Sequence, residues 1–279
     1  MTFTRNCWRL GIGLVLTGAI GSGVLADPPT EPGKLPVGDP PSDITPVVAK
    51  VVSATPTVNG AEALPKALAE AKTVYAKTRD YSGYMVRQER IGGKLQPEQT
   101  AEIRVRVAPF AIFTKTIAPK SLLGQELAFM TGKKDDKVRV RAAGVAGVSG
   151  YVSVSMDDPK ANVDSRHSLA ETGIGAIMKR VEMAMNAERK AKTSPQILVA
   201  DYKFNNRPCT RYEVFCERPH QGRYAYRMVM YVDNEFKLPV RFEAYDATKT
   251  GDSAGEMFEC VSFVSLKLNG GLGDAVFER

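Results

Sequence analysis

Between residues 224 and 268 the sequence alternates so regularly that few folds can accommodate it. Two runs, 224–232 and 236–245, place an apolar side chain at every second position and flank the acidic turn Asp233-Asn234-Glu235. A period of two that is interrupted by a turn is typical of an antiparallel hairpin with one face on a core. A third run, 257–268, follows a turn-rich gap. The stretch therefore predicts a three-strand meander, and it contains no catalytic motif.

Shorter runs of the same kind recur upstream and are separated by turn residues. We expect strands at 81–91, 100–107, 110–117, 125–131, 137–142, 151–156, 196–202 and 209–217. The run 151–156 is the least regular of these, so the expected total is ten or eleven strands. Turn signals about every 8–12 residues favour an antiparallel sheet or barrel.

Two segments have helical spacing instead. Residues 64–78 place apolar side chains on one side, with Pro65 in the first turn, which is typical of an amphipathic helix. Residues 168–188 open with Ser168 and Glu171 in the spacing of a capping box and continue with a stripe that contains methionines. This second helix either packs on the sheet as ordinary core or acts as a lid over an apolar cavity.

These elements together predict a mainly β (α+β) fold. A single-faced sheet of ten or eleven strands must curl on itself or pack on a second sheet. We therefore expect a large curved antiparallel sheet that forms a half-open barrel, with the helices covering its concave face.

The first 60 residues are expected to lie outside this fold. Residues 1–26 combine a basic leader, an apolar run and a small-x-small cleavage pattern, which predict a signal peptide and export to the periplasm or cell envelope. The alternative is a membrane anchor, but the run is short and contains five glycines. Residues 27–60 hold eight of the 17 prolines and predict a disordered linker. The folded domain is then 61–279.

The charge and the cysteine content limit the classes of partner that the chain can have. Cleavage of the leader removes two arginines, so the formal net charge falls from +7 to +5. The basic residues are spread along the strands, as on a solvated face or on a surface that meets anionic lipid. An exported chain without a recognition motif is not expected to bind nucleic acid. Cys209, Cys216 and Cys260 remain, and their odd number and their spacing favour buried thiols over a disulfide.

No motif for catalysis, a metal or a cofactor stands out. The sequence lacks the zinc-binding His-Glu-x-x-His pattern, the Gly-x-Ser-x-Gly elbow and the phosphate-binding loop. His167 and His220 are expected to be surface or capping residues. Asp135-Asp136 and Asp157-Asp158 lack the ligand spacing of a calcium loop. We therefore predict a protein that is not an enzyme, with no cofactor and no metal.

Several motifs resemble one bacterial family. They are Asp80-Tyr81-Ser82-Gly83-Tyr84, Arg87-Gln88-Glu89-Arg90-Ile91, 166–174, Tyr231-Val232-Asp233, 238–243, 266–269, Leu272-Gly273-Asp274 and Phe277. They cover nearly all of 61–279, and the chain resembles an uncharacterised exported family, the domain of unknown function 1571. More distantly, 238–240 and 269–277 are similar to LolA-type periplasmic lipoprotein carriers and related lipid-binding sensor domains. That resemblance implies a half-open barrel whose apolar hollow, covered by helices, holds acyl chains.

From the resemblance we expect an exported, non-catalytic binding protein that shields acyl chains of a lipid or lipoprotein, or another apolar ligand. An envelope protein or an anionic membrane surface is a further expected partner. The predicted cavity residues are Ile103, Val105, Val107, Tyr226, Met228, Met230, Phe242, Ile177, Met178 and Val181. The alternatives are ordinary core at these positions, in an envelope structural or protein-interaction domain without a ligand, and a hydrolase with polar groups converging in a cleft. The sequence leaves open the ligand, the partners and the oligomeric state.

Overall fold

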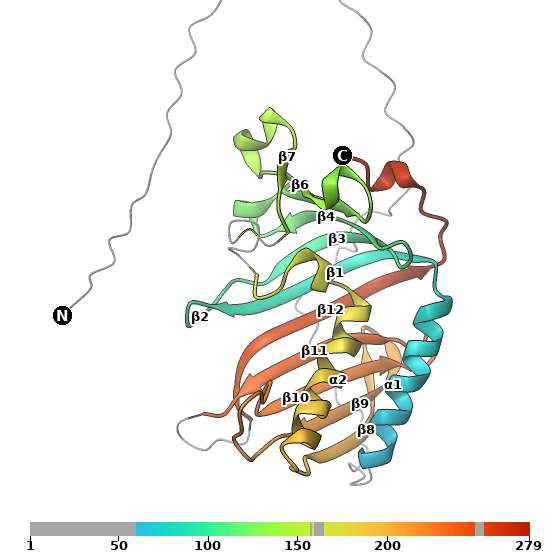
Figure 1. Ribbon diagram of the computed structural model, residues 1–279, viewed down its shortest axis with the longest axis vertical. Coiled ribbons are helices and arrows are strands. Elements are labelled where there is room, and N and C mark those ends of the chain that lie inside the picture. The colour runs from blue at the N-terminus through green and yellow to red at the C-terminus, as the bar shows by residue number, and fades with distance from the viewer. Residues whose placement is uncertain (1–59, 157, 159–164, 249–253) are drawn as a thin grey trace, which may run out of the picture. The chain divides into compact units, whose positions relative to one another are not determined.

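A computed structural model describes residues 60–156, 158, 165–248 and 254–279 (Figure 1). The predicted signal peptide and all but the last residue of the predicted linker lie outside these residues. The described residues form two α-helices, α1 (Gly60–Lys77) and α2 (Ile174–Lys190), and twelve strands. The strands are β1 (Asp80–Ile91), β2 (Lys94–Leu95), β3 (Gln99–Arg106), β4 (Ala111–Ala118), β5 (Glu126–Met130), β6 (Val138–Arg141), β7 (Val152–Val154), β8 (Gln196–Phe204), β9 (Arg207–Phe215), β10 (Arg227–Asp233), β11 (Pro239–Asp246) and β12 (Glu256–Leu268).

The strands form one antiparallel sheet made of two meanders. Their order is β7-β6-β5-β4-β3-β1-β12-β11-β10-β9-β8, and β2 pairs with β1 alone. The meander β3–β7 leaves from one side of β1, and the meander β8–β12 returns to its other side. The long β1–β12 pair joins them, from Tyr81 opposite Leu268 to Glu89 opposite Glu259. Because β7 and β8 stay at opposite ends of this order, the sheet is unclosed, and the predicted half-open barrel is confirmed.

Both helices lie on the same face of the sheet, over the half formed by β8–β12 (Figure 1). α1 packs on β8 and on α2, and α2 packs on β11. Their apolar sides and the sheet bury one continuous cluster, which includes Leu64 of α1, Ile177 of α2 and Phe242 of β11. Each side chain of this size contributes about 1.5–3 kcal/mol when it is fully buried. No described helix combines the length and the apolar character that a membrane span requires.

The start of α2 differs from the prediction. Ser168 and Glu171 do form the capping box, but it opens a separate 3₁₀ turn, Leu169–Glu171, and not the helix. Gly173 then adopts a φ of 107°, which residues with a Cβ rarely adopt, so the helix begins only at Ile174. A Cβ at Gly173 would also lie 2.4 Å from the hydroxyl oxygen of Tyr81. Conformation and close packing therefore both require glycine at this position.

The three cysteines outside the predicted signal peptide are buried and unbridged. Burial raises the pKa of the thiols of Cys209 and Cys260 to about 11 and that of Cys216 to about 12. The thiols are therefore protonated at neutral pH and pack as small apolar groups. The predicted burial of these residues is confirmed.

Candidate functional site

A cleft of about 380 Å³ opens beside the first half of α2. Its apolar and aromatic lining is Tyr75 of α1, Val107 and Phe110 between β3 and β4, Met183 of α2, and Tyr224 before β10. Its polar lining is His167, Glu171 and Thr172 before α2, with Lys179 and Arg180 on the helix. The volume falls within the range of roughly 300–1,000 Å³ that is usual for small-molecule sites. The cleft therefore combines apolar and aromatic side chains with charged ones.

Most of the predicted cavity residues belong to the buried core and do not line this cleft. Val107 lines it. Eight others are at most 3% exposed and belong to the core between the helices and the sheet: Ile103, Val105, Met228, Met230, Phe242, Ile177, Met178 and Val181. The structure brings these eight together as packed core, and their contact with a ligand stays a prediction.

Tyr226 departs from the predicted alternation. β10 begins at Arg227, and Ala225 takes a place in the core cluster ahead of it. The ring of Tyr226 lies outside that cluster and meets the ring of Phe215 edge-on, with 6.3 Å between the centroids. The period of two breaks before the strand starts, so Tyr226 does not share the face of Met228.

Two tyrosine hydroxyls hold the start of α2. A helix leaves its first N–H groups without partners inside the helix, and Gly173 has no side chain that caps them. The hydroxyl of Tyr81 in β1 accepts the N–H of Ile174 at 3.0 Å, and the hydroxyl of Tyr75 in α1 accepts that of Gly175. The hydroxyls of Tyr81 and Tyr75 also interact with each other, and burial raises the pKa of Tyr81 well above its usual value. The start of α2 is thus tied to the sheet and to α1.

A histidine holds the other end of α2. Glu188 is 2% exposed, and its Oε1 lies 2.8 Å from Nε2 of His220 in the loop between β9 and β10. The hydroxyl of Thr193 donates to the other carboxylate oxygen. The hydrogen bond to Glu188 raises the pKa of His220. Burial alone would raise the pKa of Glu188, but the hydrogen bonds from Thr193 and His220 leave it below its usual value.

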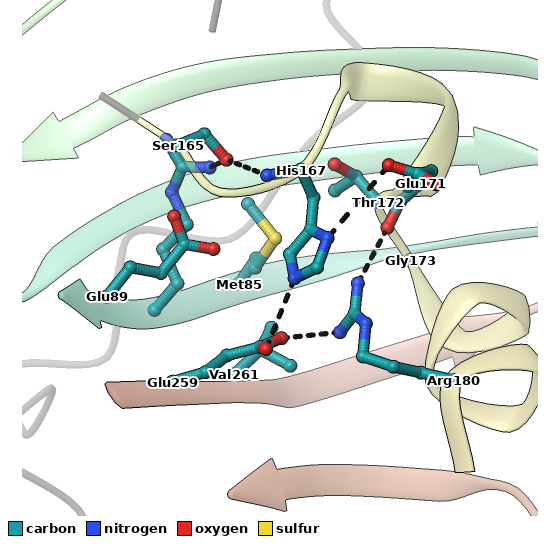
Figure 2. A pocket seen from close by; sticks show the side chains of 11 residues that line it. Met85, Glu89, Ser165, His167, Glu171, Thr172, Gly173, Arg180, Glu259 and Val261 are labelled. Atoms are coloured by element: carbon teal, nitrogen blue, oxygen red, sulfur yellow. Dashed lines mark hydrogen bonds and ion pairs between the residues drawn. The ribbon is translucent and has the colours of Figure 1, made fainter. Parts of the chain in front are cut away.

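Next to the cleft, the covered face of the sheet changes from apolar to charged (Figure 2). Met85 and Glu89 lie four residues apart on β1. Glu259 of β12 lies opposite Glu89 in the register. His167 reaches the same point from the segment before α2, and Arg180 reaches it from α2. The guanidinium of Arg180 donates to Oε1 of Glu259 at 2.6 Å. These residues line an opening of about 20 Å³, which is room for one water-sized group.

The charges of this cluster centre on Glu259, which is 1% exposed. Burial would raise its pKa, but the contacts with His167 and Arg180 and the hydrogen bond from the hydroxyl of Tyr224 hold that pKa below its usual value. Glu259 is therefore ionised at neutral pH. Chemically, the carboxylates offer ligands for a cation, while Arg180 and the exposed Lys179 offer positive charge to an anionic group in the cleft.

A comparison with protein families decides the family of the chain. The sequence profile of a family described as protein of unknown function (DUF1571) matches residues 78–279. The chain belongs to the DUF1571 family. The match includes every described strand and α2, and it confirms the resemblance drawn from the motifs. No curated protein matches this DUF1571 protein.

Several solved structures are similar to this DUF1571 protein at low sequence identity. An uncharacterized conserved protein from Thermus thermophilus is 11% identical with a TM-score of 0.44, over 78% of this chain and 93% of that one. The lipoprotein LppX from Mycobacterium tuberculosis is 10% identical with a TM-score of 0.43, over 75% and 98%. A LolA superfamily protein from Nitrosomonas europaea is 12% identical with a TM-score of 0.30, over 77% and 97%.

Sequence reasoning missed the charged cluster of this DUF1571 protein, although one signal was present. Tyr81, Met85 and Glu89 are four residues apart in one strand, so they share a face, and a buried acid interrupts the apolar series. Burial of a charge is costly unless it is paired, so an acid at such a position indicates a specific partner. The partner itself, Glu259, lies far away in the sequence, and only the register of β1 and β12 brings the two together.

Proposed function

We propose that this DUF1571 protein is an exported cell-envelope binding protein that shelters an acyl chain of a lipid or lipoprotein, or another apolar ligand, beside α2 without catalysis. The observation that carries the proposal is the cleft of about 380 Å³, which is lined by apolar, aromatic and charged side chains. Binding sites commonly enclose an apolar body and orient its polar end with a few groups. Here Tyr75, Phe110 and Tyr224 would contact the apolar body, and Lys179 and Arg180 the polar end. Export rests on the predicted signal peptide.

The binding free energy would come from transfer of apolar surface out of water. Covering a few hundred Å² at about 25 cal/mol per Å² contributes several kcal/mol, from which the cost of ordering the ligand is subtracted. Met183 is an accessible large apolar side chain of the cleft, because 60% of its surface is exposed. Its unbranched thioether side chain adapts to irregular shapes. A ligand that covers Met183 therefore removes apolar surface that now faces water.

Access to the deeper predicted residues requires movement of α2. Val107 faces the cleft, whereas Met228 and Phe242 are covered in the core on which α2 packs. α2 carries Ile177 and Met178 into the same core. A long chain would extend from the cleft toward Met228 and Phe242 when α2 shifts, and it would be released by the same movement.

The test is native mass spectrometry with lipid extraction on the mature protein from its own envelope fraction, together with uptake of a fluorescent fatty acid. We expect a co-purifying acyl lipid and saturable uptake. Met183→Glu places a charge in the cleft and is expected to weaken uptake about tenfold or more. Leu123→Glu is the matched control, because Leu123 is 52% exposed and does not line the cleft. A clean apo mass without uptake would exclude the carrier function.

A second function is favoured by a different observation. Val145 and Val148 are 89% and 83% exposed in the 3₁₀ segment Gly144–Ser149, next to the edge strand β7. Exposed apolar side chains beside an unpaired sheet edge are suited to docking another protein. Under this alternative the core is filled and the domain serves as an envelope interaction module. A clean apo mass, together with cross-links from this segment to an envelope protein that Val148→Glu abolishes, would support it.

A further inference from the structure

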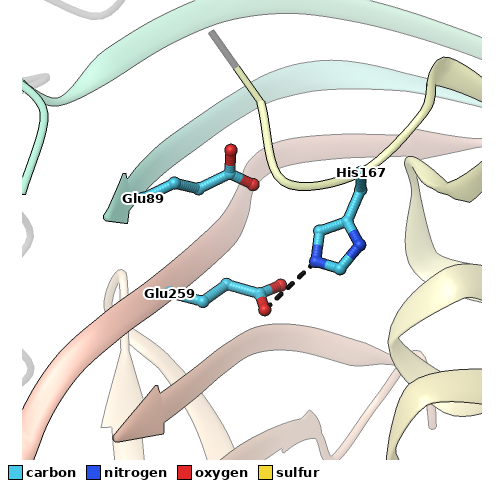
Figure 3. A group of neighbouring side chains, drawn as sticks. All are labelled: Glu89, His167 and Glu259. Carbon is cyan, nitrogen blue, oxygen red and sulfur yellow. Dashed lines mark ion pairs between the residues drawn. The ribbon is translucent and has the colours of Figure 1, made fainter. Parts of the chain in front are cut away.

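Two buried carboxylates face each other across the β1–β12 pair (Figure 3). Glu89 is 7% exposed and Glu259 is 1% exposed. Like charges directly opposite each other on neighbouring strands destabilise a sheet, and burial strengthens their repulsion because it lowers the local dielectric constant. One oxygen of each carboxylate and one ring nitrogen of His167 all lie within 4.8 Å of one another. A cation among these three atoms would offset the repulsion.

One ring nitrogen of His167, Nε2, faces the carboxylates and lies within ion-pair distance of Glu259. Its Nε2 is inaccessible to solvent and makes no hydrogen bond of good geometry there, although Oε2 of Glu259 lies 3.2 Å away. A neutral imidazole would offer a lone pair at this point, which is the usual form of a metal-ligating histidine. We propose that Glu89, His167 and Glu259 bind a divalent transition-metal cation of the Zn²⁺ class.

Outer contacts orient His167 and Glu259 for this role. Oε2 of Glu171 lies 3.9 Å from Nδ1 of His167, so a carboxylate stands on the side of the ring away from the proposed metal. Glu259 is fixed by the guanidinium of Arg180 and the hydroxyl of Tyr224. Carboxylate–histidine–metal arrangements with hydrogen-bonded carboxylate ligands are the usual surroundings of protein metal sites.

The position of Glu89, the third ligand, and the space between the three ligands also fit a metal site. Glu89 accepts the backbone N–H of Arg166 through Oε2 at 2.9 Å, and this contact holds its carboxylate beside the segment that carries His167. The opening of about 20 Å³ among these residues accommodates one ion or one water. Three protein ligands that leave a fourth position open are typical of accessible zinc sites.

The ligand set also selects the kind of metal. One imidazole with two carboxylates suits Zn²⁺ and its first-row neighbours, whereas Ca²⁺ takes six to eight oxygen ligands. The opening is lined by three carboxylates, of Glu89, Glu171 and Glu259, and by two guanidiniums, of Arg87 and Arg180, so one negative charge remains for an incoming cation. The site does not depend on the acyl-chain proposal, because none of its three ligands is needed to form the apolar wall of the cleft.

The test is titration of the untagged mature protein with Zn²⁺ by isothermal calorimetry after chelator treatment, with metal content measured by mass spectrometry. We expect one Zn²⁺ per chain, without competition from Ca²⁺. His167→Gln and Glu89→Gln are each expected to weaken binding about 10- to 100-fold. His220→Gln is the matched control, because His220 also lies beside a buried glutamate, Glu188, but belongs to no three-ligand group in the described residues.

Two further measurements distinguish loss of metal binding from loss of folding in a variant. Circular dichroism of each variant verifies its fold, and the visible spectrum of the Co²⁺-loaded wild type reports nitrogen and oxygen coordination without any substitution. Absence of Zn²⁺ binding in the wild type, or unchanged affinity in folded His167→Gln, would overturn the proposal. Fatty-acid uptake measured before and after chelation separates this outcome from a failure of the carrier function.

Discussion

Replacement of Tyr81 by phenylalanine is expected to weaken the start of α2 without a change in apolar packing. The tyrosine ring is 0% exposed, and phenylalanine fills the same space. The substitution removes the hydroxyl that accepts the N–H of Ile174 at 3.0 Å and interacts with the hydroxyl of Tyr75. In the variant this N–H is left at a buried helix start without its partner.

The magnitude follows from the two hydrogen bonds that are lost. A buried donor that loses its partner costs about 1–3 kcal/mol, whereas a typical neutral hydrogen bond contributes about 0.5–1.5 kcal/mol. The N–H of Ile174 is in the first category, because Ile174 is 0% exposed. The hydroxyl of Tyr75 is in the second, because it still accepts the N–H of Gly175. We therefore expect the free energy of unfolding to fall by about 2–3 kcal/mol.

Urea denaturation followed by circular dichroism measures this loss. The midpoint is expected to fall while the slope stays constant, because the surface exposed on unfolding is unchanged. Tyr212→Phe is the control: Tyr212 lies in the same core cluster at 8% exposure, and no hydrogen bond of its hydroxyl is seen among the described residues. A double-mutant cycle with Tyr75→Phe gives the coupling between the two hydroxyls. Equal losses for Tyr81→Phe and Tyr212→Phe would refute the assigned capping role.

Two more predictions concern other polar contacts. Asp233 is 1% exposed, accepts the N–H of Phe236 at 2.8 Å and pairs with Arg207. Asp233→Ala is therefore expected to lower the free energy of unfolding, measured by thermal denaturation, by about 2–3 kcal/mol. A loss below about 1 kcal/mol would contradict this prediction. The pKa of His220 is raised in the folded chain by its hydrogen bond to Glu188. This pair therefore stabilises the fold fully below the unfolded-state pKa of about 6.5, and the stabilisation is lost as pH rises through the folded-state pKa. The difference in urea midpoint between the wild type and His220→Gln should shrink as pH rises, and a constant difference would argue against the pair.

Most strands can be predicted from the sequence because one face of the sheet packs on the core. Strong alternation fixes which side chains must face the core, and the expected strand 100–107 agrees with β3, Gln99–Arg106, within one residue at each end. β2, Lys94–Leu95, is missed because two residues are too short to show any period. The start of α2 is misplaced because the capping box is a local signal, whereas the positive φ of Gly173 depends on its approach to Tyr81.

The site is less predictable, because it depends on what covers the inward positions. Ile103 and Val105 face the core as expected, yet alternation does not tell whether a ligand or a helix fills the space beside them. In the structure both side chains belong to the continuous buried cluster, and the cleft is lined by α2 together with Phe110 of the β3–β4 turn. The acids of the charged cluster likewise meet only through long-range register, which leaves no trace in local spacing.

The cleft and the charged cluster share His167 and Arg180, so the two proposals meet at one end of α2. A cation held by Glu259 would fix the carboxylate that anchors Arg180, and it would fix the segment that carries His167 toward Gly173. It would thus tighten the end of α2 that Tyr81 already caps. The other end depends on the pH-sensitive pair of His220 and Glu188 and borders a more open depression of about 600 Å³. Met183 lines both this depression and the cleft, so an apolar chain bound in the depression would lie next to the cleft.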